Sequence, residues 1–220
     1  MGTNESNVKI TTADPSALGL FGLAMVTLVA STQKLGLTEG VSFVLPWAIF
    51  LGAFAQLFAA INDSKRNNTF GTVAFGAYAF FWFAIGTSWM IQLGIFGEKA
   101  ALSIDSKQLG FAFIGYLIFT IYMTIGAVEI NKVLFIIFFL IDLLFIGLAL
   151  STFGIAPEFG HNLAGISELT LSLVSFYGSA ASVLNTHFGR VFLPVGNPLG
   201  IFKKDAQNEV KVGYTVKNET

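Results

Sequence analysis

Long stretches of the chain are apolar on every side, and the charged residues gather in the short segments between them. The hydrocarbon core of a bilayer requires about 20 apolar residues per helix. Six windows approach this length with no charge or with a single acid, and the first extends to Leu37 if Lys34 reaches the interface with its ammonium group. The pattern therefore predicts six transmembrane helices, over residues 17–33, 42–61, 70–96, 109–128, 133–153 and 169–189.

These windows favour helices over the strands of a membrane barrel. A barrel strand alternates apolar and polar residues over about ten positions, whereas the windows are continuously apolar. A helix satisfies its backbone hydrogen bonds within the segment, as lipid requires. We therefore expect an all-α membrane protein with an N-terminal tail at 1–13, a six-helix domain at 14–195 and a polar, flexible C-terminal tail at 196–220.

Composition excludes several classes of protein. Apolar residues make up 54% of the chain and charged residues only 11%, against roughly 25% charged in average globular proteins. A formal net charge of −1 argues against a nucleic-acid partner. The absence of Cys excludes disulfides and thiolate metal sites, and two His are too few for a His-based metal site. We expect no cofactor, no metal and no enzymatic activity.

The distribution of basic residues predicts the orientation in the membrane. Cytoplasmic loops carry an excess of Lys and Arg. With six spans, nine of the 12 Lys and Arg residues share the side of the two termini, and Lys34, Lys99 and Lys107 lie on the other. The nine are Lys9, Lys65, Arg66, Lys132, Arg190, Lys203, Lys204, Lys211 and Lys217. Both termini are therefore expected in the cytoplasm, with the protein in the plasma membrane.

Asp14 and Pro15 open the first span. Asp is a favoured N-cap and Pro suits the first helical turn, so the simple interpretation is a helix start. The alternative is that the free N–H groups of this turn face an anion at the cytoplasmic mouth of a pathway. The sequence favours capping.

A few polar side chains fall inside the spans. Phe75 and Tyr78 lie on one face of the third span, where packing is the usual role of aromatics, but a Tyr hydroxyl within a membrane needs a partner. Gln56 indicates either an interhelical hydrogen bond or a polar pathway. Asp142 lies at the centre of the fifth window, where a charge costs about 2.5 kcal/mol or more. We favour a role in a pathway or as a proton site over a structural hydrogen bond, and expect Glu168, at the start of the sixth window, to be interfacial.

Transport is the class of function that these features leave open. The first alternative is a membrane sensor or assembly protein that transports nothing. A membrane enzyme is a further alternative, which the missing catalytic cluster disfavours.

Several motifs resemble those of the acetate uptake transporter family, which includes bacterial succinate–acetate permeases and related fungal proteins. They occur in the family's order over most of residues 14–196. They are Asp14-Pro15-Ser16-Ala17-Leu18-Gly19-Leu20, Ala55-Gln56-Leu57-Phe58-Ala59, Asn68-Thr69-Phe70-Gly71 with Ala74-Phe75, Tyr78 and Phe81-Trp82, and Val183-Leu184-Asn185 with Phe188-Gly189-Arg190 and Leu193-Pro194.

The resemblance implies a cyclic homo-hexamer in the lipid bilayer, with a pathway for acetate, and for other small carboxylates such as succinate, in each protomer. It also implies an apolar constriction, carried over by motif to Leu23, Tyr78 and Ile141, of which only Tyr78 is the residue usual in the family. Two acids depart from the pattern, since Asp14 replaces an Asn and Asp142 a small polar residue. The expected pathway residues are Asp14, Pro15, Leu18, Gly19, Gln56, Phe75, Tyr78, Asp142 and Asn185.

Overall fold

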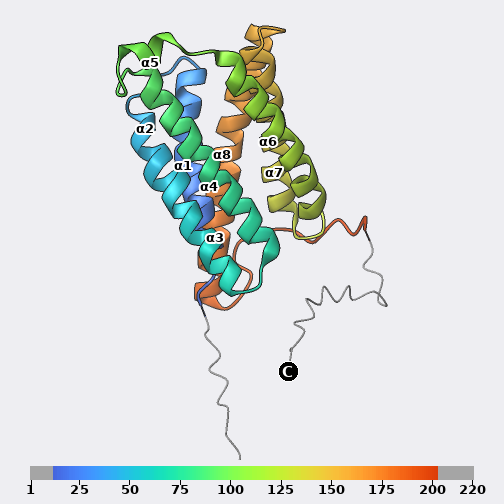
Figure 1. Ribbon diagram of the computed structural model, residues 1–220. Helices are drawn as coiled ribbons and strands as arrows, with labels where there is room; N and C mark the ends of the chain where they lie inside the picture. Colours follow the sequence, from blue (N-terminus) through green and yellow to red (C-terminus); the bar gives the residue numbers. More distant parts are fainter. Residues whose placement is uncertain (1–11, 203–220) are drawn as a thin grey trace, which may run out of the picture.

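The computed structural model describes residues 12–202, and every regular element in that range is a helix (Figure 1). Residues 1–11 and 203–220 lie outside the described part, so most of both predicted tails is outside it as well. The elements are α1 Ser16–Lys34, α2 Val44–Trp47, η1 Ala48–Ala55, α3 Gln56–Lys65, α4 Thr69–Gln92, α5 Glu98–Leu102, α6 Ser106–Ala127, α7 Lys132–Thr152 and α8 Pro157–Phe188.

Six long helical segments run side by side, because α2, η1 and α3 join end to end as one segment, Val44–Lys65 (Figure 1). The prediction of an all-α protein with six long helices is confirmed. Five segments, which are α1, Val44–Lys65, α4, α6 and α7, can cross a membrane by length and composition alone. The sixth, α8, is the longest at 32 residues, and its many Ser, Gly and charged residues make it less apolar than the others.

Side-chain caps fix where several helices begin. The Asn68 side chain accepts a hydrogen bond from the Gly71 N–H at the start of α4, and Asn131 accepts one from Leu134 at the start of α7. Each satisfies one of the N–H groups that a helix leaves free at its N-terminus. At the other end of α8, Gly189 adopts a left-handed conformation with φ 62°, which Gly tolerates without strain.

The six segments form a ring. Each packs against two neighbours, in the order α4, α2–η1–α3, α1, α8, α7 and α6, and α6 returns to α4 through a smaller interface. α7 and α8 approach closely at Gly147 and Gly160, where a Cβ on Gly147 would stand 2.6 Å from the Gly160 carbonyl oxygen. Small residues allow such backbone contact between membrane helices. Side chains of the six segments therefore face a common interior.

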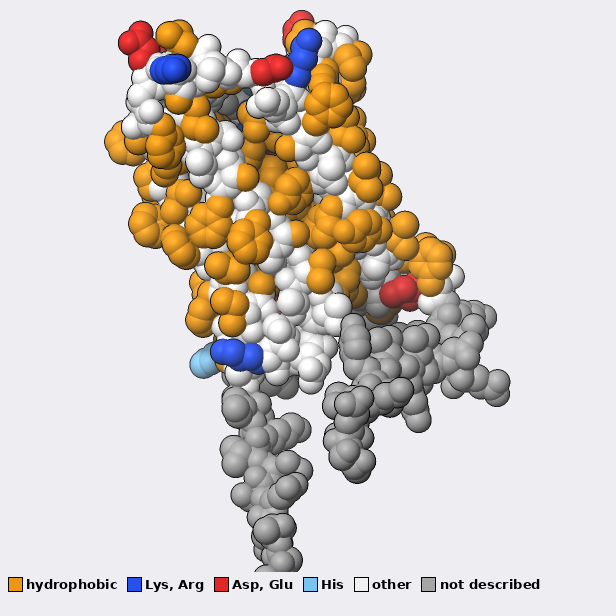
Figure 2. Space-filling view, viewed as in Figure 1, with side chains coloured by type: hydrophobic (Ala, Val, Ile, Leu, Met, Phe, Trp, Pro, Cys, Tyr) orange, Lys and Arg blue, Asp and Glu red, His pale blue; other side chains and the backbone are white. Residues whose placement is uncertain are grey.

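The outer surface suits a bilayer. Apolar side chains cover the middle of the molecule, whereas the charged side chains in view lie near its two ends (Figure 2). The start of α1 and the end of α8 lie at one end of the ring, which we call the terminal end (Figure 1). The opposite end, which carries α5 and the connections 35–43 and 153–156, is called the far end.

Candidate functional site

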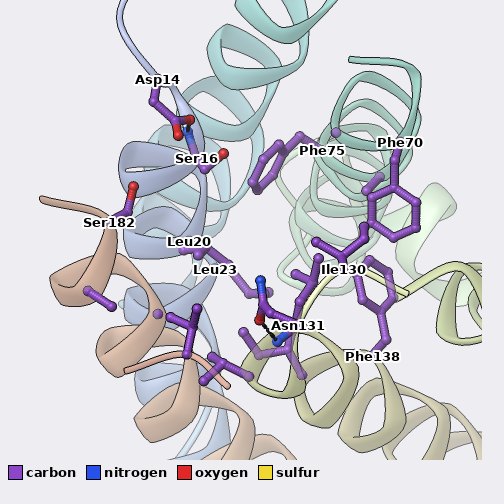
Figure 3. Close-up of a pocket in the computed structure, with 18 of the residues that line it drawn as sticks. Asp14, Ser16, Leu20, Leu23, Phe70, Phe75, Ile130, Asn131, Phe138 and Ser182 are labelled. Atoms are coloured by element: carbon purple, nitrogen blue, oxygen red, sulfur yellow. Dashed lines mark hydrogen bonds between the residues drawn. The ribbon is translucent and has the colours of Figure 1, made fainter. Parts of the chain in front are cut away.

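A cavity of about 380 Å³ opens among α1, α3, α4, α7 and α8 in the terminal half of the ring. Figure 3 shows side chains at α1, α4, α7 and α8, among them Leu20, Phe75, Phe138 and Ser182, around this common space. Asp14, Asn68 and Asn131 line it near the helix starts. Leu23, Tyr78 and Ile141 line it seven to nine residues beyond the first residues of α1, α4 and α7, or roughly 10–14 Å from these helix starts at 1.5 Å per residue.

The mouth of this terminal cavity carries one carboxylate, and it is neutralised. Asp14 Oδ1 accepts a hydrogen bond from the Ser16 N–H at 2.9 Å and lies 3.0 Å from Arg66 Nη1. Partial burial alone would raise the pKa of Asp14, but the hydrogen bond and the guanidinium outweigh it and hold the pKa below its ordinary value. The expectation that Asp14 is the N-cap is wrong by one position: Pro15 is the N-cap of α1, which begins at Ser16, and Asp14 bonds the Ser16 N–H from the residue before the cap.

The three residues of the expected constriction line the same cavity. Leu23, Tyr78 and Ile141 are all buried, with 6%, 5% and 3% of their surface exposed. The Phe138 ring lies 6.1 Å from the Tyr78 ring and adds a fourth bulky group. All four are available to close the inner end of the cavity.

The Tyr78 hydroxyl is already engaged. It lies 2.9 Å from Thr120 Oγ1 on α6, and that hydroxyl in turn donates its single proton to the Tyr116 carbonyl at 2.7 Å. Because a Thr hydroxyl has only one proton, Tyr78 must be the donor to Thr120. Its proton is therefore committed to α6, and Tyr78 presents mainly its ring to the cavity.

Gln56 lines the cavity with a buried amide that has no hydrogen-bond partner among the described residues. It is the first residue of α3, directly after the π-helical turns of η1, and its side chain is fully buried. Neither the amide nitrogen nor the amide oxygen has a hydrogen-bond partner among the described residues. A buried amide without partners costs about 1–3 kcal/mol, and a water or ligand in the cavity would offset this cost by supplying them.

Asn185 lines the cavity, but its amide holds the chain that follows α8. Its Oδ1 accepts from the N–H groups of Phe192 and Leu193, and its Nδ2 donates to the Leu193 carbonyl. These bonds use the amide group to position the following chain. Further along, the Leu199 N–H donates to the Val128 carbonyl, so at least this residue of the predicted flexible tail is bound to the ring.

The other expected pathway residues divide into those near the cavity and those away from it. Phe75 lines the cavity and packs directly on Gly19, so that any side chain at Gly19 would collide with its ring. Pro15 is buried at the helix start without lining the cavity, and Leu18 is 41% exposed on the outside of α1.

Asp142 lines neither of the two cavities described for residues 12–202. Its Oδ2 accepts a hydrogen bond from Thr124 Oγ1 on α6 at 2.7 Å, and its Oδ1 is buried without a partner among the described residues. Asp142 therefore connects α7 to α6, one position after Ile141, whose side chain does line the terminal cavity.

A second, smaller cavity of about 140 Å³ lies in the far half of the ring. Lys34 and Glu168 line it together, with Lys34 Nζ 2.9 Å from Glu168 Oε2. Glu168 was expected at the membrane interface; the structure shows that α8 begins at Pro157 and that Glu168 lies inside the bundle, where its side chain is 3% exposed. Lys34 likewise contacts Glu168 rather than extending freely to the interface.

The linings of the two cavities come closest along α4 and α7. On α4, Tyr78 lines the terminal cavity and Phe81 the far one; on α7, Ile141 lines the terminal cavity and Leu144 the far one. Three residues along a helix correspond to about 4.5 Å. On α1 and α8, by contrast, the two linings lie ten residues apart, at Leu23 and Gln33 and at Gly178 and Glu168, so the packed side chains between the cavities are thinnest on the α4–α7 side.

An all-helical membrane protein with a cavity in each half of a six-segment ring is the class that fold and site define. Its sequence matches the GPR1/FUN34/yaaH family over residues 2–197, and the chain belongs to that family.

Two relatives and a solved structure extend the match. The succinate-acetate/proton symporter SatP of Escherichia coli (strain K12) is 32% identical over 185 residues, which cover 84% of this chain and 95% of that protein. Ammonia transport outward protein 2 of Saccharomyces cerevisiae (strain ATCC 204508 / S288c) is 28% identical over 176 residues, covering 78% and 61%. The structure of the bacterial acetate channel SatP superposes with a TM-score of 0.77 at 30% identity, covering 84% of this chain and all of that one.

These matches confirm the resemblance and the fold drawn from the sequence motifs. The relatives are named as transport proteins rather than enzymes, in agreement with the expected absence of catalysis.

Proposed function

We propose that this protein moves acetate and similar small carboxylates across the plasma membrane through a pathway within each protomer. The names of the bacterial relatives support the substrate class. The observation that carries the proposal for this chain is the Gln56 amide, fully buried and without partners in a cavity that ends at a ring of bulky side chains.

Gln56 suits a carboxyl group in either protonation state. Its NH₂ group can donate to a carboxylate oxygen, and its carbonyl can accept the proton of an undissociated acid. A protonated acid offers one donor and one acceptor side by side, which matches the amide in both respects. Because no ionised group lines the deep part of the terminal cavity, transport linked to a proton is the form that this geometry favours.

Leu23, Tyr78 and Ile141 are proposed as the gate. Bulky apolar groups close a narrow passage by excluding water, and the support for this assignment is that all three residues are buried and line the terminal cavity. Thr120 and Tyr116 hold α6 against α4 at this level, which keeps the Tyr78 ring in place.

Assembly and orientation are further proposals. The family resemblance supports a homo-hexamer, and the predominantly apolar outer face of α6 is available for lipid or for a second copy. The distribution of basic residues supports cytoplasmic termini. Protease protection of terminal tags in spheroplasts tests the orientation, and native mass spectrometry of the purified protein tests the hexamer.

Uptake of labelled acetate into proteoliposomes tests the function directly. We expect uptake above that of empty liposomes, and faster uptake when the acetate side is more acidic. A sensor or assembly protein would give no flux with or without the pH gradient, and that result would reject the proposal.

A further inference from the structure

The Lys34–Glu168 pair is a buried ion pair of the described part of the ring that the proposed gate does not use. Lys34 is the last residue of α1, and Glu168 lies roughly 16 Å along α8 from its start. Their Nζ and Oε2 atoms are 2.9 Å apart, and both residues line the far cavity. Other lining groups include Trp82, Trp89 and Ser88.

Stability alone is a weak reason for such a pair. Removing two charges from water offsets much of their attraction, and apolar replacements of buried pairs are often neutral or stabilising. Here one hydrogen bond joins the two groups, although an ammonium has three donors. Lys34 therefore retains two N–H donors at the wall of the far cavity, in addition to the one that it donates to Glu168.

The cavity matches a small carboxylate in size. Its volume of about 140 Å³ is well below the 300–1,000 Å³ or so of sites for drug-sized ligands. Trp82, Trp89 and Phe81 provide apolar walls, and the one cation at the lining is Lys34. Lys99 and Lys107, which belong to the same end of the molecule, are exposed and do not line it.

We propose that Lys34 is the carboxylate-binding residue of the far cavity and that Glu168 is its resident counter-ion, which a substrate carboxylate displaces from Lys34. The substrate exchanges one carboxylate for another at the same ammonium, so Lys34 remains paired throughout. Glu168 is a positioning residue, because it fixes the ammonium at the cavity wall and competes with the substrate for it. This inference rests on the proposed transport of carboxylates and assigns a second binding site on that pathway.

Tryptophan fluorescence provides a readout that does not require transport. The chain has three Trp residues, of which Trp82 and Trp89 line the far cavity and Trp47 does not. The experiment uses the full-length Trp47→Phe variant, purified in detergent. Titration with acetate should change the tryptophan emission in a saturable manner, and sodium chloride at equal ionic strength serves as the blank. Lys107→Gln is the matched control and should give the same curve.

Three variants separate binding from structural support. Glu168→Gln removes the competitor and should lower the half-saturating acetate concentration about tenfold, the scale of one charge-assisted hydrogen bond. Lys34→Gln should abolish the response. Either single change leaves one buried charge unpaired. The double variant, Lys34→Gln with Glu168→Gln, replaces the ion pair by two neutral amides. It should keep the parental melting temperature and give no fluorescence response to acetate.

The same preparations are assayed for acetate flux in liposomes. A saturable response of the parent that survives in the double variant would overturn the inference, because the pair would then be structural. The absence of a response in the parent would overturn it as well. Absence of flux alongside an intact, Lys34-dependent response would instead reject transport while leaving the binding site in place.

Discussion

The terminal and far cavities offer a carboxylate different partners. The terminal cavity is about 380 Å³, and its deep polar group is the uncharged amide of Gln56. Asp14 is the one charged side chain in the lining of this cavity. It lies at the mouth and contacts Arg66. The far cavity is about 140 Å³ and contains a cation and an anion in direct contact.

This difference follows the cost of charge along the membrane normal. An unpaired charge at the centre of a membrane helix costs about 2.5–3.5 kcal/mol on insertion scales. Next to the gate, the polar contact is an amide, which requires only hydrogen-bond partners. Lys34, in contrast, ends its helix, and its charge is paired. On this view the far cavity concentrates the anion and the terminal cavity handles the carboxyl group in neutral form.

The largest effect is expected for Gln56→Leu. The substitution removes the deep polar contact of the terminal cavity, and acetate flux in proteoliposomes should fall about tenfold or more. Because the amide has no partner among the described residues, its loss should leave the melting temperature unchanged or raise it. Gln92→Leu, at the exposed end of α4, is the control. Parental flux in Gln56→Leu would remove this amide from the pathway.

A smaller change in acetate flux, an increase rather than a decrease, is expected for substitutions at Leu23 and Ile141. Leu23→Ala and Ile141→Ala should each raise acetate leak several-fold and admit larger carboxylates, because they widen the dewetted passage. Each should also destabilise the protein by about 2–5 kcal/mol, as other large-to-small core changes do.

The control for this pair is Ile146→Ala, which truncates an exposed side chain of α7. Size selection is measured by counterflow with acetate, propionate and butyrate. If both cavity variants retain parental selectivity while the protein stays folded, the three residues do not form the gate.

Much of the fold could be predicted from the sequence, because membrane helices are specified by long apolar windows. The windows at 109–128 and 133–153 lie within a few residues of α6 and α7. The sixth window, 169–189, missed the first three turns of α8, since Glu158 and Glu168 interrupt the apolar pattern. The sequence signal that could have found them is the Pro157 helix start.

The sequence could predict single polar residues of the site, but not which residues pair with one another. Gln56 stands out as a polar residue within an apolar run. The Lys34–Glu168 pair joins residues 134 positions apart, so no local pattern shows it. Asn185 could be placed at the cavity, but that its amide binds Phe192 and Leu193 depends on how the chain turns after α8.

Asp142→Asn tests whether a third polar element lies on the pathway. The hypothesis from sequence is a flatter pH dependence of flux, because the variant keeps a similar shape without titrating. The position outside both cavities and the bond from Thr124 favour the structural alternative. We therefore expect an unchanged pH profile of acetate uptake between pH 5 and 8 (about the range where substrate protonation varies), with a small change in melting temperature. A flattened profile at equal protein level would return Asp142 to the pathway.

The smallest effect is expected for Asp14→Asn at the mouth of the terminal cavity. The Ser16 N–H and Arg66 hold the pKa of Asp14 below its ordinary value despite partial burial. A carboxyl group whose pKa is lowered on folding stabilises the protein above its unfolded pKa of about 3.9. That contribution is lost as the pH falls through the folded value. Since both partners are over a third exposed, the contribution is at most about 1 kcal/mol.

Asp14 therefore stays ionised from pH 5 to 8, and Asp14→Asn should leave the shape of the flux–pH curve intact over that range. Its melting temperature should fall slightly relative to the parent at pH 7, and the difference should narrow at pH 3, below the unfolded pKa of about 3.9. Differential scanning fluorimetry at the two pH values, beside the flux assay, measures both effects. A change in the shape of the flux–pH curve would mean that the mouth of the terminal cavity, and not only its interior, takes part in proton-linked transport.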